Sequence, residues 1–175
     1  MERPNLVFDP NNLYALIIGI NDYPLRQTWR SLNGAVADAN NFKDYLTSPA
    51  HLNVPEDHVC VMLNSKRRDI ISAFRELKEG RLHTGGGTKE IDLPHLSAFV
   101  LFYAGHGGRT AIPDSNEWND YHTPDNGVEQ LVPSDIGMRD ESGEEIQGIP
   151  DRTIAAVLKG LVENIGDNVV SLAAE

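Results

Sequence analysis

The chain has 175 residues, and its 40% hydrophobic content is enough for one domain with a sizeable core. The 26 acidic and 15 basic residues give a formal net charge of −11, which disfavours nucleic acid and anionic membrane surfaces as partners. No apolar run reaches the roughly 20 residues of a membrane span and the N-terminus lacks the pattern of a secretory signal, so we expect a soluble cytoplasmic protein. With one cysteine, Cys60, the chain offers no internal disulfide and no multi-cysteine zinc site.

The first half of the chain predicts two strands, each followed by a helix. Residues 13–20 form an apolar run that ends in turn-forming residues, as expected of a strand. Residues 59–63 are a shorter strand candidate, after which Asn64 or Ser65 is expected to cap a helix that Gly80 ends. The apolar stripes of the two helices are Ala35, Ala39, Phe42 and Leu46 in the first, and Ile70, Phe74 and Leu77 in the second.

The second half continues the same alternation. Residues 81–95 and 109–127 are expected to be loops, with a strand at 98–103 between them and a short extended piece at 129–132. An acidic loop over 135–148 precedes a helix that Asp151 is expected to cap, and a last strand begins at 169. This order predicts an α/β fold, a three-layer α/β/α sandwich with helices on both faces of a mainly parallel sheet.

The strand at 98–103 carries the most informative residue at its end. Residues 99–103 are uniformly apolar, which predicts a strand covered on both faces. Gly105, Gly107 and Gly108 follow and let the backbone turn, so that His106 lies at the carboxyl end of the strand. Ligands bind at this end of open α/β sheets, although a histidine that only caps the strand remains an alternative.

Five segments spread over nearly the whole chain belong together. They are 14–21 (Tyr-Ala-Leu-Ile-Ile-Gly-Ile-Asn), 32–39 (Leu-Asn-Gly-Ala-Val-Ala-Asp-Ala), 102–107 (Phe-Tyr-Ala-Gly-His-Gly), 131–135 (Leu-Val-Pro-Ser-Asp) and 148–154 (Gly-Ile-Pro-Asp-Arg-Thr-Ile). In this order they resemble the caspase-like cysteine peptidases, most closely the metacaspase branch of fungi and plants. The resemblance implies a caspase-like domain at 13–175, after an N-terminal extension at 1–12.

The family's chemistry needs a thiol nucleophile, a histidine base and backbone N–H groups that hold the oxyanion. The resemblance implies that His106 is the catalytic general base and acid, and that Gly107 supplies an oxyanion-hole N–H. The family's cysteine aligns with about Glu175, so the chain lacks the nucleophile and we expect a domain truncated in its fourth strand. Cys60 lies in an apolar strand and is expected to be an inert buried thiol, so the chain as it stands is expected to be inactive.

Leu32 occupies the position where aspartate-cleaving caspases have the arginine that pairs with the substrate carboxylate. The resemblance therefore implies cleavage after arginine or lysine. No cofactor is expected. Calcium activates many relatives, but the acids of the two loops do not have EF-hand spacing, and no metal site is expected from the spacing of the remaining histidines. Those acids are Asp114, Asp120, Asp125, Asp140, Glu141, Glu144 and Glu145, and those histidines are His51, His58, His83, His95 and His122.

Two functional hypotheses remain open at this point. The first is a cysteine endopeptidase domain that acts on protein or peptide substrates, with the family's role in proteolysis and programmed cell death. The second is an inactive caspase-like module that acts by binding other chains, including caspase-like partners, because an unfinished sheet exposes unpaired backbone groups. A nucleotide-binding α/β domain has the same order of elements, but the chain lacks a phosphate-binding fingerprint.

Overall fold

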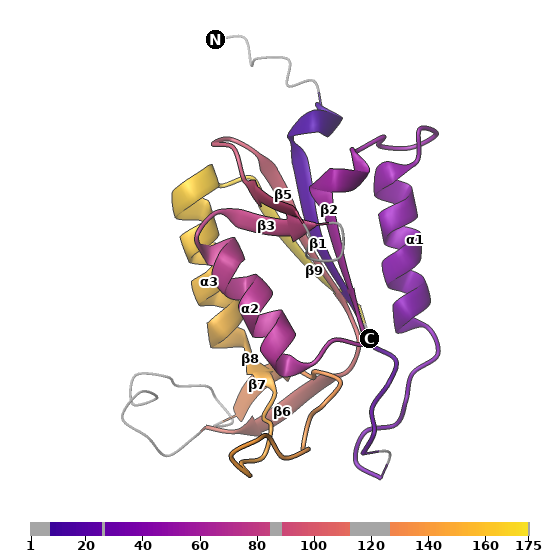
Figure 1. Ribbon diagram of the computed structural model, residues 1–175, viewed down its shortest axis with the longest axis vertical. Coiled ribbons are helices and arrows are strands. Elements are labelled where there is room, and N and C mark those ends of the chain that lie inside the picture. Colours follow the sequence, from indigo (N-terminus) through magenta and orange to yellow (C-terminus); the bar gives the residue numbers. More distant parts are fainter. Residues whose placement is uncertain (1–7, 26, 85–88, 113–126, 175) are drawn as a thin grey trace.

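A parallel four-stranded sheet forms the centre of the molecule (Figure 1). The computed structural model describes residues 8–25, 27–84, 89–112 and 127–174. The strands lie in the order β2 (Val59–Leu63), β1 (Leu13–Gly19), β5 (Ala98–Ala104) and β9 (Val169–Ala174), and each neighbouring pair is parallel. The sequence prediction of a mainly parallel sheet is thereby confirmed.

Helices cover both faces of this sheet. Figure 1 shows α1 (Ala35–Thr47) on one face and both α2 (Arg67–Lys78) and α3 (Asp151–Ile165) on the other. Helices α1 and α2 turn their predicted apolar stripes toward the sheet, and α3 does the same with its buried residues Val157, Leu161 and Ile165, because burying such a stripe is what stabilises a helix of this length. The three-layer sandwich is as expected. Among the described residues the longest helix has 15 residues, and none combines the length and apolar character of a membrane span.

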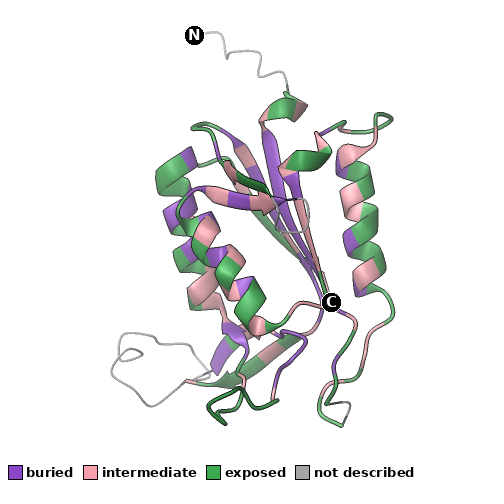
Figure 2. Cartoon of the chain, viewed as in Figure 1, coloured by how far each residue is buried: buried purple, intermediate pink, exposed green. Residues whose placement is uncertain are grey.

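The central strand β1 is buried along its whole length, which Figure 2 shows in purple. Its side chains alternate between the faces, as the two-residue period of a strand requires. Leu13, Ala15 and Ile17 belong to the apolar cluster under α1. Tyr14, Leu16 and Ile18 belong to the larger cluster under α2 and α3.

Strand β5 departs from the expectation that it is covered on both faces. Phe99, Leu101 and Tyr103 are buried on the α2/α3 face, but Val100 and Phe102 on the α1 face are only partly buried. The reason is geometric, since α1 packs mainly over β1 and touches β2 and β5 only at its flanks, and no second helix of the described residues lies beside it on that face.

Two segments that the sequence predicted as loops contain strands. The hairpin of β3 (Arg81–Thr84) and β4 (Lys89–Asp92) lies beside α2, where alternate residues Leu82 and Thr84 are buried. A second small sheet at the carboxyl end of the large one contains β6 (Gly107–Ala111), β7 (Gly127–Leu131) and β8 (Ile149–Pro150). These strands are too short and too polar for periodicity to reveal them, and the pairing of distant segments stabilises them.

Helix α2 begins differently from the prediction. Its N-cap is Lys66, which makes no capping hydrogen bond through its side chain. The carboxylate of Asp135, far away in sequence and almost fully buried, accepts a hydrogen bond from the Arg67 N–H at 2.8 Å and so stabilises the helix start. Asn64 instead adopts a left-handed conformation, and its side-chain oxygen accepts from the N–H groups of Asn21 and Asp22.

Candidate active site

His106 is partly exposed and lies between β5 and β6, at the carboxyl end of the large sheet where the sequence predicted it. Its imidazole Nε2 is 2.7 Å from the carbonyl oxygen of Arg30 in the loop after β1. The ring packs beside Tyr23 and Trp29, with centroid distances of 4.8 and 5.6 Å. Three contacts from one loop therefore hold the orientation of this ring.

The contact with Arg30 determines which nitrogen of His106 is basic. A carbonyl oxygen can only accept, so Nε2 must carry the proton and donate it. In the neutral ring Nδ1 is then unprotonated. His106 can take up a proton at Nδ1 while the bond from Nε2 keeps the ring in place, which is the arrangement that a general base requires.

Two buried tyrosines hold the main chain around His106. The N–H of His106 donates to the Tyr23 hydroxyl at 3.0 Å. The Tyr103 hydroxyl lies 2.9 Å from the carbonyl oxygen of His106 and 3.0 Å from that of Val132. Burial raises the pKa of Tyr23 above its ordinary value, so this phenol stays neutral. The N–H and the carbonyl oxygen of His106 are thus both held by tyrosine hydroxyls. The sequence had not indicated this role for either tyrosine.

The hydrogen-bond ladder leaves the Gly107 N–H out of the β6–β7 pairing. Gly107 lies opposite Leu131, and the N–H of Val132 donates to the carbonyl oxygen of His106 at 3.1 Å. This bond makes Gly107 and Leu131 a non-hydrogen-bonded pair, in which both N–H groups point away from the partner strand. Gly107 is also exposed. Its N–H therefore points away from β7, on the side where the resemblance places an oxyanion.

Strand β9 reaches the same place from a distant part of the chain. Its last described residue, Ala174, pairs with Ala104, and the Gly105 N–H donates to the Ala174 carbonyl oxygen at 3.2 Å. A cavity of about 520 Å³ opens between this end of β9 and the β6–β7 sheet. Gly107, Glu129, Asp151 and Ala174 help to line it, and His106 does not. The described part of β9 therefore ends beside Gly105, one residue before His106, and Glu175 lies outside the described residues.

Cys60 lies too far from His106 to act with it. Cys60 pairs with Leu16, which pairs with Leu101, so β1 separates the thiol from β5. Two strand spacings are roughly 10 Å, and Leu101 lies roughly a further 10 Å before the strand's end. Burial raises the pKa of the Cys60 thiol to about 11, which leaves little thiolate at neutral pH.

The remaining predicted residues do not converge on His106. Leu32 packs partly buried against the core. In the second acidic loop, the Asp140 carboxylate accepts hydrogen bonds from Ser142 and from the Glu144 N–H, which hold its pKa below the usual range. These contacts close the loop on itself. The first acidic loop with Asp114, Asp120 and Asp125, together with Trp118 and His122, lies outside the described residues.

Comparisons with known proteins identify a solved structure with a similar fold and a family to which the chain belongs. Similarity to a solved structure is found with protein GSU0716 from Geobacter sulfurreducens, at 20% identity and a TM-score of 0.55. The match covers 92% of this chain and 48% of that one, so the chain spans about half the length of its structural relative. No curated protein sequence matches the chain. Residues 12–156 match the family model of the caspase domain, and the chain therefore belongs to the caspase-domain family of cysteine peptidases.

Proposed function

We propose that this chain is the histidine-bearing part of a cysteine endopeptidase domain of the metacaspase branch, with His106 as general base and acid. The observation that carries the proposal is the orientation of the His106 ring. Its Nε2 is engaged by the Arg30 carbonyl oxygen, which leaves Nδ1 as the basic atom. Nδ1 would take the proton of a thiol during attack on the substrate carbonyl and return it to the leaving amine.

Two further features support this mechanism. The Gly107 N–H points away from β7 and lies one residue after the base, where it would hold the oxyanion. The nucleophile would come from a segment that follows β9, since Ala174 lies beside Gly105. The position and raised pKa of the chain's own Cys60 support a nucleophile from elsewhere.

For the substrate, we propose protein chains that are cleaved after arginine or lysine. Leu32 offers no positive charge for an aspartate side chain, and the acidic character of the protein suits basic peptides. The family's role in programmed cell death and a cytoplasmic location belong to the same proposal, and rest on the resemblance of the five sequence segments.

The test is the reading frame beyond codon 175, followed by expression of the extended chain. We expect an in-frame cysteine shortly after β9 and hydrolysis of arginine and lysine peptides that His106→Ala abolishes. His95→Ala is the matched control, because His95 is exposed and outside the site. A verified stop codon at this position would overturn the peptidase proposal.

A second candidate is a caspase-like module that works by binding another chain. It is favoured by the apolar side chains Val170 and Leu172, which are 51% and 43% exposed on β9. They lie on the same face as Val100 and Phe102, next to the part of the sheet that α1 does not cover. Size-exclusion chromatography with light scattering and a pull-down against caspase-like chains test this, and a monodisperse monomer without a partner would argue against it.

A further inference from the structure

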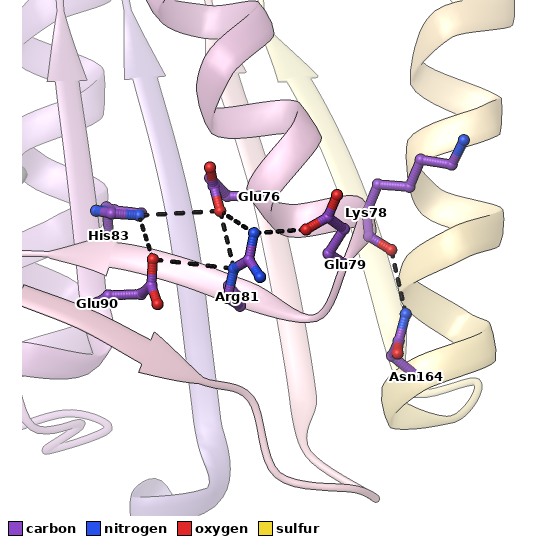
Figure 3. A network of polar contacts seen from close by, with 7 residues as sticks. All are labelled: Glu76, Lys78, Glu79, Arg81, His83, Glu90 and Asn164. Atoms are coloured by element: carbon purple, nitrogen blue, oxygen red, sulfur yellow. Dashed lines mark hydrogen bonds and ion pairs between the residues drawn. The ribbon is translucent and has the colours of Figure 1, made fainter.

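A compact polar cluster lies away from His106, where the end of α2 meets the β3–β4 hairpin (Figure 3). Its centre consists of Glu76 from α2, His83 from β3 and Glu90 from β4. The His83 Nε2 is 3.1 Å from Glu90 Oε2 and 4.0 Å from Glu76 Oε2. Within the described part of the chain, this is the one group of three histidine or acidic side chains whose ligand atoms all lie within 4.8 Å of one another.

The fold itself brings these three side chains together. His83 and Glu90 are directly opposite in the antiparallel register of the hairpin, so their side chains lie on one face. Glu76 is on the last full turn of α2, just before the chain turns into β3. Tight turns and strand pairing thus set the spacing, and no sequence motif is needed to produce it.

The charges of the cluster do not balance. Arg81 bonds Glu76 at 2.6 and 2.9 Å, bonds Glu79 and lies 3.9 Å from Glu90. Three carboxylates face one guanidinium, which leaves a local charge of −2 when His83 is neutral. Figure 3 shows the Lys78 side chain pointing away from the cluster, so this lysine does not compensate the excess. The charge of a divalent cation would balance this excess of two negative charges.

We propose that Glu76, His83 and Glu90 bind one Zn²⁺ ion, which fastens the β3–β4 hairpin to α2. Zn²⁺ takes nitrogen and oxygen ligands at about 2.0–2.2 Å, so tetrahedral ligand atoms lie about 3.3 Å apart. The observed separations of 3.1 and 4.0 Å differ from this value by less than 1 Å. The exposed fractions of the three side chains, 29%, 37% and 52%, leave them room for this adjustment.

The ligand atoms, one imidazole nitrogen and two carboxylate oxygens, favour some metal ions over others. An imidazole nitrogen with two carboxylate oxygens suits Zn²⁺, whereas Ca²⁺ requires six to eight oxygen ligands. On binding, the neutral His83 ring carries its single proton on Nδ1, so that the Nε2 lone pair, which lies 3.1 Å from Glu90 Oε2, binds the metal. Arg81 remains bonded to Glu76 and Glu79 and orients the carboxylates, as outer-sphere groups do in metal sites.

A neighbouring cavity leaves space for the fourth ligand. It has a volume of about 560 Å³, and Glu76 and His83 are part of its wall together with Cys60, Met62 and Leu82. Water can therefore reach the metal position from this side and complete the tetrahedron. The site does not depend on the proposed peptidase function, because it shares no residue with the surroundings of His106.

Isothermal titration calorimetry of the untagged chain with zinc chloride tests the proposal. We expect one high-affinity site per chain, and a loss of affinity of more than about 100-fold in His83→Gln and in Glu90→Gln, because even outer-sphere changes cost about 10- to 100-fold. Glu79→Gln and His95→Gln are the matched controls and should retain the site. Calcium chloride should not compete.

Two further readouts keep the proposal falsifiable if a variant is unstable. Zn²⁺ should raise the thermal unfolding midpoint of the parent chain, and this shift should disappear in Glu90→Gln, whose side chain is half exposed and whose loss should leave the fold intact. Co²⁺ should give the absorption spectrum of a tetrahedral site. Equal zinc affinity in the parent chain and in both ligand variants, or no stoichiometric binding to the parent chain, would leave only an ion-pair network and overturn the proposal.

Discussion

The two faces of the central sheet differ in how completely they are covered. On the α2/α3 face, the apolar cluster extends from Tyr14 through Phe99 to Ile165, and its members are almost fully buried. On the α1 face a smaller cluster under one helix covers β1 and β2, while β5 and β9 keep apolar side chains partly or largely exposed. Figure 2 shows this difference as buried strands at the centre and exposed segments toward β9.

The α2/α3 face, which is the more completely covered one, also holds His106. Tyr23, Tyr103 and Val132, which fix the main chain around His106, all belong to the cluster under α2 and α3. The closed core thus restrains the main chain of His106, whereas the face beside β9, called the open face below, keeps apolar side chains exposed. The following predictions compare the two faces.

The largest effect should come from removing one aromatic side chain from each face of β5. Phe99→Ala should reduce the free energy of unfolding by about 3–5 kcal/mol, since Phe99 is fully buried. Phe102→Ala should cost roughly half as much, because this ring is half-buried and stacks on Phe42 at 4.5 Å. Guanidinium denaturation measures both. Equal costs would mean that the two faces are equally well packed.

Alanine substitutions at two closely packed glycines compare how tightly the helices pack on each face of the sheet. A Cβ on Gly19 would lie 2.6 Å from Ala39 Cβ and 2.9 Å from the Ala35 carbonyl oxygen, so Gly19→Ala should destabilise the fold by about 1–3 kcal/mol. On the other face, a Cβ on Gly160 would lie 2.5 Å from Lys78 Cγ and 3.0 Å from the Lys78 carbonyl oxygen, but alanine favours a helix by about 1 kcal/mol, which offsets part of this clash. The second variant should therefore lose less stability in thermal unfolding, and the reverse order would contradict this packing.

The hydrogen bond between the Tyr23 hydroxyl and the His106 N–H should position the histidine from the core of the α2/α3 face. Tyr23→Phe removes the acceptor of the His106 N–H, which should cost about 1–2 kcal/mol of stability. We also expect the His106 ring signals in an NMR spectrum to shift and broaden. Tyr45→Phe is the control, since Tyr45 is 47% exposed. An unchanged His106 signal in Tyr23→Phe would show that the hydroxyl does not position the histidine.

The alkylation rate of the Cys60 thiol measures how well the α2/α3 face shields this side chain from solvent. Because burial raises its pKa to about 11, alkylation of the native chain should be slow at pH 8 and accelerate about tenfold per pH unit up to about pH 11. The folded pKa is above the ordinary value of 9.0, so this thiol's contribution to stability is present below pH 9 and is lost as the pH rises through about 11. Urea-unfolded chain should react faster at pH 8, and equally fast alkylation of the native chain would contradict the partly buried position of Cys60.

The smallest effect on stability is expected at the open face. Val170→Thr and Leu172→Thr keep β-forming residues and change exposed positions, so each should alter the free energy of unfolding by less than about 0.5 kcal/mol. Their self-association, measured by light scattering, should decrease. Leu101→Thr on the covered face is the matched control and should be strongly destabilising. A similar loss in all three variants would show that the open face is covered after all.

The sequence by itself determined the large elements, their order and the position of His106. The apolar run of β1 and the helical stripes of α1 and α2 contain their own signals, because burial of a strand or of a helix face requires apolar residues at fixed periods. The glycines around His106 likewise indicated a turn at the end of a strand. The motif 131–135 was recognised, but the role of Asp135 at the start of α2 was not, since sequence separation conceals a contact between distant segments.

Only the tertiary structure decided which groups face His106 and which face of the sheet stays open. The Arg30 carbonyl oxygen and the Tyr23 hydroxyl reach the histidine because parallel strands end at one edge of the sheet, a relation that no local pattern contains. The exposure of Val170 and Leu172 follows from where α1 packs rather than from their own hydrophobicity. The Glu76, His83 and Glu90 cluster has the same origin, since the register of a hairpin and the end of a helix bring its side chains together.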